Sequence, residues 1–255
     1  MTKFLISLVP FILYMILKYR KSIYMLQQNS YNVSNRYIKW IFKNLRKSFI
    51  TYDIIIFIIL LLTNLLFKNY LAYIIGIIYF ICFYIELKLI KKEQQKKKFV
   101  ITSRVKRLYF TLFILFTILI IFICKNHNDF YGYLYISLFG YFSFIITFIL
   151  NIINIPAEKF VYYYYLNKAR KKLKNMPNLN IIGITGSYGK TSSKNILNTI
   201  LSSEFNSYPT PKSFNTPYGL MKSINNGLDK FDNVFIAEMG ACKLKDIKIL
   251  CDLVH

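Results

Sequence analysis

The chain has few acidic residues, few histidines and no cysteine pattern typical of a disulfide or metal site. It carries 11 Asp and Glu against 34 Lys and Arg, which gives a formal net charge of +23 over 255 residues. The two histidines, His127 and His255, are too far apart to suggest a metal site. The four cysteines show no paired or metal-type spacing, so we expect reduced thiols in a cytosolic or membrane setting. They are Cys82, Cys124, Cys242 and Cys251.

The shortage of acidic residues makes nucleic acid and anionic membrane surfaces the two natural partners of this chain. The distribution of the cations separates these alternatives. Lys and Arg cluster in short blocks beside long apolar runs, as they do where they orient membrane spans. The sequence therefore favours a membrane protein in contact with lipid and predicts no nucleic-acid partner.

Long apolar runs fill residues 1–155, where hydrophobic residues are frequent enough to raise the whole chain to 55%. A bilayer is spanned by about 20 apolar residues in a helix. The shortest run contains Pro10 and could instead be a signal peptide, but no small-residue cleavage site follows it. We predict an α-helical membrane domain of about five spans, near residues 4–17, 49–67, 70–90, 108–124 and 131–155.

The basic residues between these runs predict the orientation of the domain. The connections 18–48 and 91–107 are rich in Lys and Arg, whereas the alternate connections carry almost none. Basic loops remain in the cytoplasm. With five spans, the N-terminus lies outside and everything after residue 155 lies inside, so we expect a multi-pass protein of a bacterial cytoplasmic membrane.

Acidic residues are rare within the predicted spans. Asp53 and Glu86 both fall near predicted cytoplasmic ends, within reach of basic residues. A proton or ion path would require ionisable groups near the middle of the membrane. The spans are therefore expected to anchor the chain, with transport as the less favoured alternative.

Residues 156–178 form a predicted connector. Pro156 ends the last span, and good helix formers from Ala157 to Lys174 are followed by Pro177. Four consecutive tyrosines, 162–165, lie beside a basic cluster that could stack on and neutralise RNA. A juxtamembrane helix on anionic headgroups explains the same residues without any nucleic-acid motif and is preferred.

From residue 179 the sequence predicts the start of an α/β P-loop domain with a mostly parallel sheet. The segment "NIIGITGSYGKTSSKNILNTILSS", 180–203, is typical of a strand, a glycine-interrupted loop and a helix. Ile196, Leu197, Ile200 and Leu201 form one apolar stripe on that helix. An ordinary strand-to-helix turn is the alternative interpretation.

Each residue type in this loop suits a nucleotide phosphate. Gly186 and Gly189 permit a tight backbone whose N–H groups point at phosphate oxygens, and the helix N-terminus adds partial positive charge. Lys190 supplies a cation for the terminal phosphates, and the Thr191 hydroxyl can ligate Mg²⁺. The predicted ATP-binding residues are Thr185, Gly186, Ser187, Tyr188, Gly189, Lys190, Thr191 and Ser192.

A second polar position follows a later apolar strand. In "NVFIAEMGA", 233–241, Glu238 ends the strand at the sheet edge where doubly wound folds collect their ligands. A carboxylate facing Thr191 would complete a magnesium site, although an exposed strand-end acid is the simpler alternative. Asn215 could contact substrate or could be a turn residue before Pro217.

These motifs resemble the Mur ligases. The loop Thr-Gly-x-x-Gly-Lys-Thr directly after a strand lacks the first glycine of the longer P-loop pattern, because Ile184 stands there. "TPKSFNTPYGL", 210–220, resembles the asparagine-containing loop of that family, and "LKDIKILCDLVH", 244–255, resembles the helix after the Glu-Met-Gly-Ala strand. The Glu-Met-Gly-Ala sequence is most similar to the branch that adds D-alanyl-D-alanine to the cell-wall precursor.

The resemblance implies an ATP- and Mg²⁺-dependent ligase that forms an amide bond through an acyl phosphate. Its partners would be a UDP-MurNAc-peptide carboxylate and an amino-acid or dipeptide amine. Lys190 and Glu238 would be the catalytic residues, Thr191 and Glu238 would hold the metal, and Asn215 and Thr216 would contact substrate. Lys190 and Mg²⁺ would stabilise the charge that develops during phosphoryl transfer.

The chain also departs from the family. Membrane spans occupy the place of the usual N-terminal UDP-sugar domain, and family members continue beyond the helix that follows Glu238. We therefore expect residues 1–255 to be an inactive N-terminal part of such a ligase. The alternatives are a membrane-anchored nucleotide-binding scaffold and a P-loop kinase or transport ATPase. The latter would place Asp, not Glu, at the end of the second strand.

Overall fold

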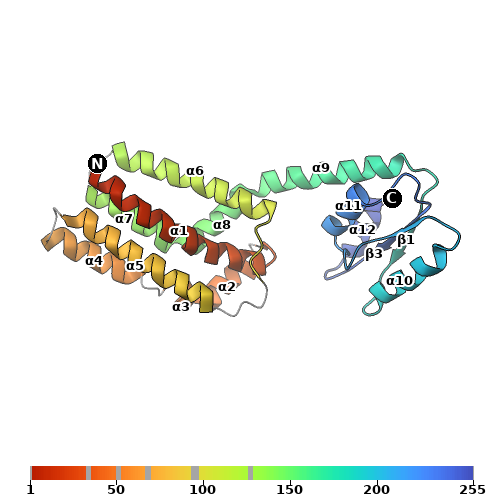
Figure 1. The fold of residues 1–255 in the computed structure, drawn as a ribbon, viewed down its shortest axis with the longest axis horizontal. Helices are drawn as coiled ribbons and strands as arrows, with labels where there is room; N and C mark the ends of the chain where they lie inside the picture. Colours follow the sequence, from red (N-terminus) through yellow and green to blue (C-terminus); the bar gives the residue numbers. More distant parts are fainter. Residues whose placement is uncertain are drawn as a thin grey trace. The chain divides into compact units, whose positions relative to one another are not determined.

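In the computed structural model the chain divides into two compact units, Met1–Ile155 and Pro156–His255. The structure describes residues 2–32, 36–49, 53–66, 70–92, 98–125 and 129–254. Figure 1 labels the helices of both units and the strands β1 and β3.

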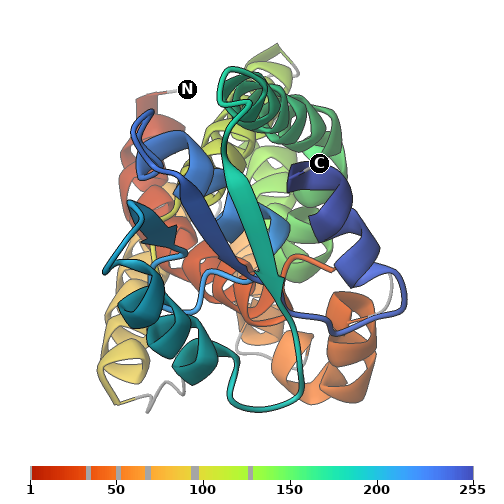
Figure 2. The ribbon, with the colours of Figure 1, turned by 90° about the vertical axis from the view of Figure 1, so that its right-hand side faces the viewer.

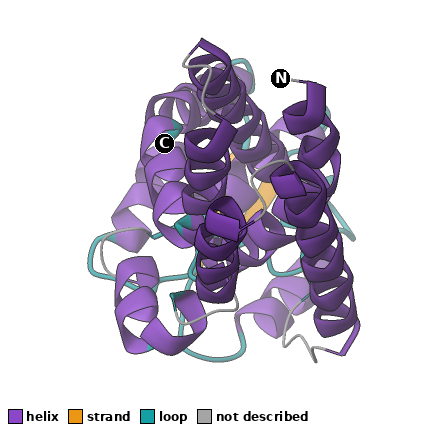
Figure 3. Cartoon of the chain, turned by 90° about the vertical axis from the view of Figure 1, so that its left-hand side faces the viewer, coloured by secondary structure: helices purple, strands orange, loops and turns teal. Residues whose placement is uncertain are grey.

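The first unit is a bundle of helices (Figure 3). Its buried apolar side chains form one core cluster. Helix α1 packs mainly against α5 and α8, and α4 packs against α7. Phe11 of α1 meets Tyr79 of α5 edge to face, with 4.8 Å between ring centroids. The helices are α1 (Thr2–Gln28), α2 (Ile38–Lys43), α3 (Leu45–Ser48), α4 (Asp53–Leu66), α5 (Leu71–Lys92), α6 (Ser103–Lys125), α7 (Asp129–Tyr141) and α8 (Ser143–Ile153).

Two described helices, over Leu71–Lys91 and Ser103–Lys125, are long and apolar enough to cross a membrane. A third span results if the bent pair α7 and α8 counts as one. The prediction of five spans is therefore not supported. Helix α4 has 14 residues, about 21 Å at 1.5 Å per residue, which is short of the ~30 Å apolar core of a bilayer.

The predicted span 131–155 is broken into α7 and α8, which meet at 75°. Two tyrosine hydroxyls donate to backbone carbonyls on either side of this break. Tyr19 donates to Phe139 O at 2.9 Å, and Tyr37 donates to Phe144 O at 3.2 Å. Side chains that engage helix carbonyls in this way are a recognised cause of helix kinks.

Polar side chains lie inside the first unit. Lys18 of α1 is buried and forms an ion pair with buried Asp53, which also accepts a hydrogen bond from Tyr14. Lys18 is thus part of a helix core and not of a basic loop, contrary to the sequence prediction. Tyr79 and Ser137 also share a hydrogen bond of 2.6 Å between α5 and α7.

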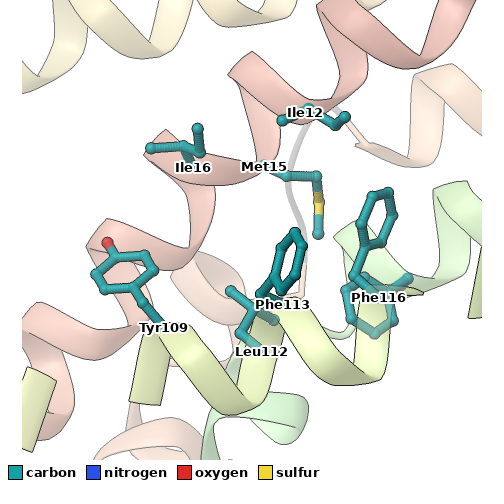
Figure 4. Close-up of a pocket in the computed structure, with 8 residues that line it drawn as sticks. Ile12, Met15, Ile16, Tyr109, Leu112, Phe113 and Phe116 are labelled. Carbon is teal, nitrogen blue, oxygen red and sulfur yellow. The ribbon is translucent and has the colours of Figure 1, made fainter. Parts of the chain in front are cut away.

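An apolar cavity of about 230 Å³ opens between α1, α6 and α7 (Figure 4). Met15 comes from α1, and Leu112 and Phe116 from α6. Ile16 and Phe113 at its edge are exposed. An apolar rim of this kind suits lipid better than water, in agreement with the two membrane-length helices.

The second unit contains a three-stranded parallel sheet in the order β1-β3-β2 (Figure 2). This confirms the predicted parallel α/β arrangement. Its elements are α9 (Ile155–Lys174), β1 (Asn180–Ile184), α10 (Lys190–Leu201), β2 (Ser207–Pro209), α11 (Pro217–Asn226), β3 (Val234–Glu238) and α12 (Asp246–Val254). In the register, Ile184 of β1 lies opposite Glu238 of β3, so both strands end at the same edge.

The central strand β3 is buried along its whole length, which explains its continuous apolar sequence. Its side chains alternate between the two faces. Phe235 and Ala237 join the core made with α9, α11 and α12, whereas Glu238 on the other face meets α10. The sheet thus directs a single carboxylate at the helix that follows the phosphate loop.

Helix α9, predicted as a connector, packs into the second unit. Leu166 and Ala169 are buried in its core, and Arg170 donates to Asp252 O at 2.9 Å. The opposite side keeps Phe160 and Tyr164 exposed. One face of α9 is therefore structural, and only the other remains for a membrane surface.

Candidate nucleotide site

The loop between β1 and α10 turns into the helix at a glycine. Gly189 precedes the helix with a φ of 74°, in the left-handed region that favours glycine. In an α-helix the N–H groups of the first turn have no acceptor within the helix, so those at the start of α10 are directed at the loop. This end of the helix can bind an anion.

Lys190 is hydrogen-bonded to the loop, whereas the Tyr188 side chain is exposed. The Lys190 ammonium donates to Gly186 O at 2.7 Å and more weakly to Ser187 O at 3.4 Å, so it folds back across the loop. Tyr188 is 96% exposed at the tip. Lys190 is therefore placed over the loop that would receive phosphate, whereas the Tyr188 ring extends into solvent.

Glu238 is buried at the end of β3, with 1% of its surface exposed. Its Oε2 accepts a hydrogen bond from Thr191 Oγ1 at 3.0 Å, and its Oε1 accepts one from Asn215 Nδ2 at 3.2 Å. Its backbone N–H donates to Thr210 Oγ1 at 3.0 Å. The alternative of an exposed strand-end acid is therefore wrong.

The structure adds a residue that the sequence reasoning missed. Lys194 is 2% exposed, and its Nζ lies 3.1 Å from Glu238 Oε2. It follows Thr191 by three residues, and residues three apart share one face of a helix. The spacing of Lys194 from Thr191 and Leu197, three residues on either side, is the sequence signal that could have identified it.

The placement of Lys194 shows which face of α10 packs on the sheet. Leu197 and Leu201 are half-buried, but Ile196 and Ile200 are 62% and 63% exposed. Lys194, Leu197 and Leu201 occupy positions i, i+3 and i+7, so the helix turns this face toward the sheet. The predicted four-residue stripe is therefore only partly turned toward the core.

The environment of Glu238 favours its ionised form. Burial alone would raise its pKa, but hydrogen bonds from Lys194 and Thr191, the positive charge of Lys194 and a hydrogen bond from Asn215 hold the pKa below the ordinary value of 4.5. Glu238 is therefore a carboxylate at neutral pH and can bind a cation.

Asn215 and Thr216 have different surroundings. The Asn215 side chain reaches Glu238, and its backbone O accepts a hydrogen bond from Gly240 N at 2.8 Å. The Thr216 side chain accepts from Gly219 N and caps α11. The structure thus brings Asn215 to the carboxylate, while Thr216 has a structural task.

The side chains at this site fit a magnesium ion that is held mainly by phosphate and water, and not a metal ion that is held by protein ligands alone. In the described part of the chain there is no group of three or more His, Cys, Asp or Glu side chains that could hold a metal ion. Mg²⁺ usually takes one or two carboxylates and completes its shell with phosphates and water. Glu238 and Thr191 match that requirement.

Comparison with known proteins finds a family match that covers the candidate nucleotide site. Residues 184–255 match the Mur ligase middle domain. The matched segment starts at Ile184, the last residue of β1, and includes the phosphate loop, Asn215 and Glu238. The match supports the Mur ligase family for this part of the chain, and Mur ligases as a family use ATP and Mg²⁺ in peptidoglycan synthesis. No curated protein and no solved structure matches the chain.

Proposed function

We propose that residues 180–254 form the nucleotide-binding part of a Mur-type, ATP-dependent ligase that makes an amide bond in a peptidoglycan precursor. The observation that carries the proposal is the hydrogen bond of 3.0 Å between the Thr191 hydroxyl at the start of α10 and the buried Glu238 carboxylate at the end of β3. This hydrogen bond places a hydroxyl and a carboxylate, the two groups that would bind Mg²⁺, next to the loop that carries Lys190.

In this proposal each residue has a defined task. The N–H groups at the start of α10 bind phosphate oxygens, and Lys190 stabilises the negative charge that develops as the γ-phosphate leaves ATP. Thr191 and Glu238 would hold Mg²⁺, which supplies charge neutralisation on the phosphates. A substrate carboxylate accepts the phosphoryl group, and an amine then displaces phosphate to form the amide.

The proposal for the substrate rests on the Glu-Met-Gly-Ala sequence that begins at the last residue of β3. We propose that the amine is D-alanyl-D-alanine and that the carboxylate belongs to a UDP-MurNAc-peptide. The contact of Asn215 with Glu238 supports a role for the 210–216 segment next to the reacting groups. Thr216 is proposed to act only through its position beside Asn215.

We further propose that the first unit anchors the ligase in a bacterial cytoplasmic membrane as a multi-pass domain. The two membrane-length helices support the anchor. The basic residues at the start of α6 favour the cytoplasm for that end of the helix, and we propose that the bent pair α7 and α8 is a third span, which returns the chain to the cytoplasm before the nucleotide site. ATP is available on that side. The anchor would also keep a precursor-synthesis enzyme near lipid-linked steps of wall assembly.

Nucleotide binding by the full chain in detergent tests the proposal. A fluorescent ATP analogue should bind in the presence of Mg²⁺, and Lys190→Ala should weaken binding on the order of 100-fold, because the terminal phosphates lose their cation. Lys248→Ala, in an exposed position of α12, is the matched control and should bind normally. Absence of binding by the folded wild-type chain would refute the proposal.

Phosphate release separates ligase activity from nucleotide binding. With ATP, a UDP-MurNAc-peptide and D-alanyl-D-alanine, a ligase should release phosphate only when both substrates are present. Because residues 1–255 alone are expected to be inactive, this assay requires a chain that also carries the remaining ligase domains of the family. Nucleotide binding without substrate-dependent release in that longer chain would favour the scaffold.

A further inference from the structure

Lys194 is a buried cation whose hydrogen-bonding capacity is fully used. Its Nζ donates to Thr210 O at 2.7 Å, to Lys212 O, and to Glu238 Oε2 at 3.1 Å. An ammonium has three donors. Each therefore has one acceptor, two from the segment after β2 and one from the strand-end carboxylate.

The segment that Lys194 holds is the one that also reaches Glu238 from the other side. It runs from Thr210 to Asn215, whose side chain donates to Glu238 Oε1 at 3.2 Å and whose carbonyl accepts from Gly240 N. Residues 210–215 are thus attached to the β3 end both through Lys194 and directly. The two carboxylate oxygens have different donors, which fixes the rotation of the carboxylate.

We propose that Lys194 is a positioning residue of the metal–nucleotide site. It holds the Glu238 carboxylate and the 210–215 segment in one arrangement and does not itself touch nucleotide. This inference rests on the proposed nucleotide site. A lysine suits the task because its compact charge carries three donors that can diverge, whereas the planar guanidinium of arginine presents a fork.

A purely structural role is the alternative, since a buried ion pair can simply be part of the fold. The two roles differ in what the metal contributes. A positioning residue affects binding of the nucleotide only when Mg²⁺ is present. A structural residue affects binding with and without the metal, and it affects the folded state to the same extent.

The test uses the full chain in detergent and a fluorescent ATP analogue, measured in Mg²⁺ and in EDTA. In the wild type, Mg²⁺ should tighten binding. Lys194→Met, and the milder Lys194→Gln, should lose about 10- to 100-fold of the Mg²⁺-dependent affinity, as partners of metal ligands typically do, and should keep the affinity measured in EDTA. Lys190→Gln should weaken both, and the exposed control Lys248→Gln neither.

Near-UV circular dichroism and amide hydrogen exchange of α11 and α12 report the fold of each variant. An unchanged Mg²⁺ effect in either folded variant would overturn the proposal. A parallel loss of both affinities and of the folded signal in both variants would also overturn it, because Lys194 would then be structural only. Failure of the wild type to bind nucleotide would instead reject the underlying nucleotide site.

Discussion

Thr191 and Glu238 are 47 positions apart in the chain, yet the hydroxyl of one donates to the carboxylate of the other at 3.0 Å. The parallel register of β1 and β3 causes this meeting, since it brings the end of β3 beside the loop that leads into α10. The hydroxyl keeps a lone pair for a second partner, so the bond to Glu238 orients Thr191 as a ligand.

Replacing Thr191 with valine tests that orientation. Thr191→Val keeps the shape but removes the hydroxyl, so we expect Mg²⁺-dependent affinity for an ATP analogue to fall about 10- to 100-fold. Stability should fall by only about 1 kcal/mol, because Glu238 retains Lys194 and Asn215. Thr199→Val on the exposed side of the same helix is the control, and equal effects of both variants would contradict the assignment.

Acid should destabilise the second unit through Glu238. The pKa of Glu238 is lowered by folding, so its ionised form contributes stability above pH 4.5, and this contribution is lost as the pH falls through the lowered pKa. Glu238→Gln should remove this part of the pH dependence in denaturant titrations between about pH 6 and 3. An unchanged pH profile in Glu238→Gln would show that other carboxylates cause the acid sensitivity.

At neutral pH the same variant should be less stable by about 3 kcal/mol, because the buried ion pair of Lys194 with Glu238 is broken by removal of one partner. The double variant Lys194→Met, Glu238→Gln should cost less than the sum of the two single variants. Additive costs in this cycle would mean that the pair is not coupled.

Gly240 leaves room for the Asn215 side chain. A Cβ at position 240 would lie 2.9 Å from Asn215 Cγ, so Gly240→Ala should push Asn215 away from Glu238. We expect a loss of about 1–3 kcal/mol in unfolding free energy. Asn215→Ala removes the three contacted atoms, so Gly240→Ala should cost clearly less in that background; the same cost in both backgrounds would contradict this explanation.

The ion pair of Lys18 with Asp53 should matter more to the first unit than any exposed charge. Asp53→Asn removes the charge of the carboxylate that pairs with buried Lys18, and we expect a loss of about 3 kcal/mol for unfolding in detergent. Combining it with Lys18→Met should restore part of the stability. Lys106→Met, in an exposed position of α6, is the control and should have little effect.

The proposed orientation can be tested with native cysteines. Cys242 is exposed in the second unit, whereas Cys124 is near the end of α6 that the charge pattern places outside. A variant that retains only Cys242 and the buried Cys82 should react with a membrane-impermeant maleimide in inverted vesicles but not in intact cells. Reaction of Cys242 in intact cells would indicate the opposite orientation of the second unit.

Local sequence was sufficient to predict the strand, loop and helix at residues 180–201, because a short apolar run, glycines and a helical stripe follow one another there. It also identified Glu238, because a carboxylate at the end of an apolar strand lies at the sheet edge where such folds bind ligands. Lys194 was missed. Its partners Thr210, Lys212 and Glu238 are distant in the chain, and only the folded sheet brings their oxygens together.

The membrane-like half was predicted less well for a related reason. Apolar composition marks helices but does not locate their breaks, and the break between α7 and α8 coincides with hydrogen bonds from Tyr19 and Tyr37 on other segments. Lys18 was counted with a basic loop because its burial depends on Asp53 of another helix. Contacts between residues distant in the sequence, and not local helix propensity, therefore account for the break between α7 and α8 and for the burial of Lys18.

Trp40 is the single tryptophan of the chain, and it packs against Phe144 in the helical unit, with 5.7 Å between ring centroids. Emission excited selectively at the indole therefore follows only the surroundings of that unit. Melting of the sheet around Glu238 would leave this signal unchanged, so a tryptophan placed at the exposed Tyr188 would give the nucleotide loop an optical reporter of its own.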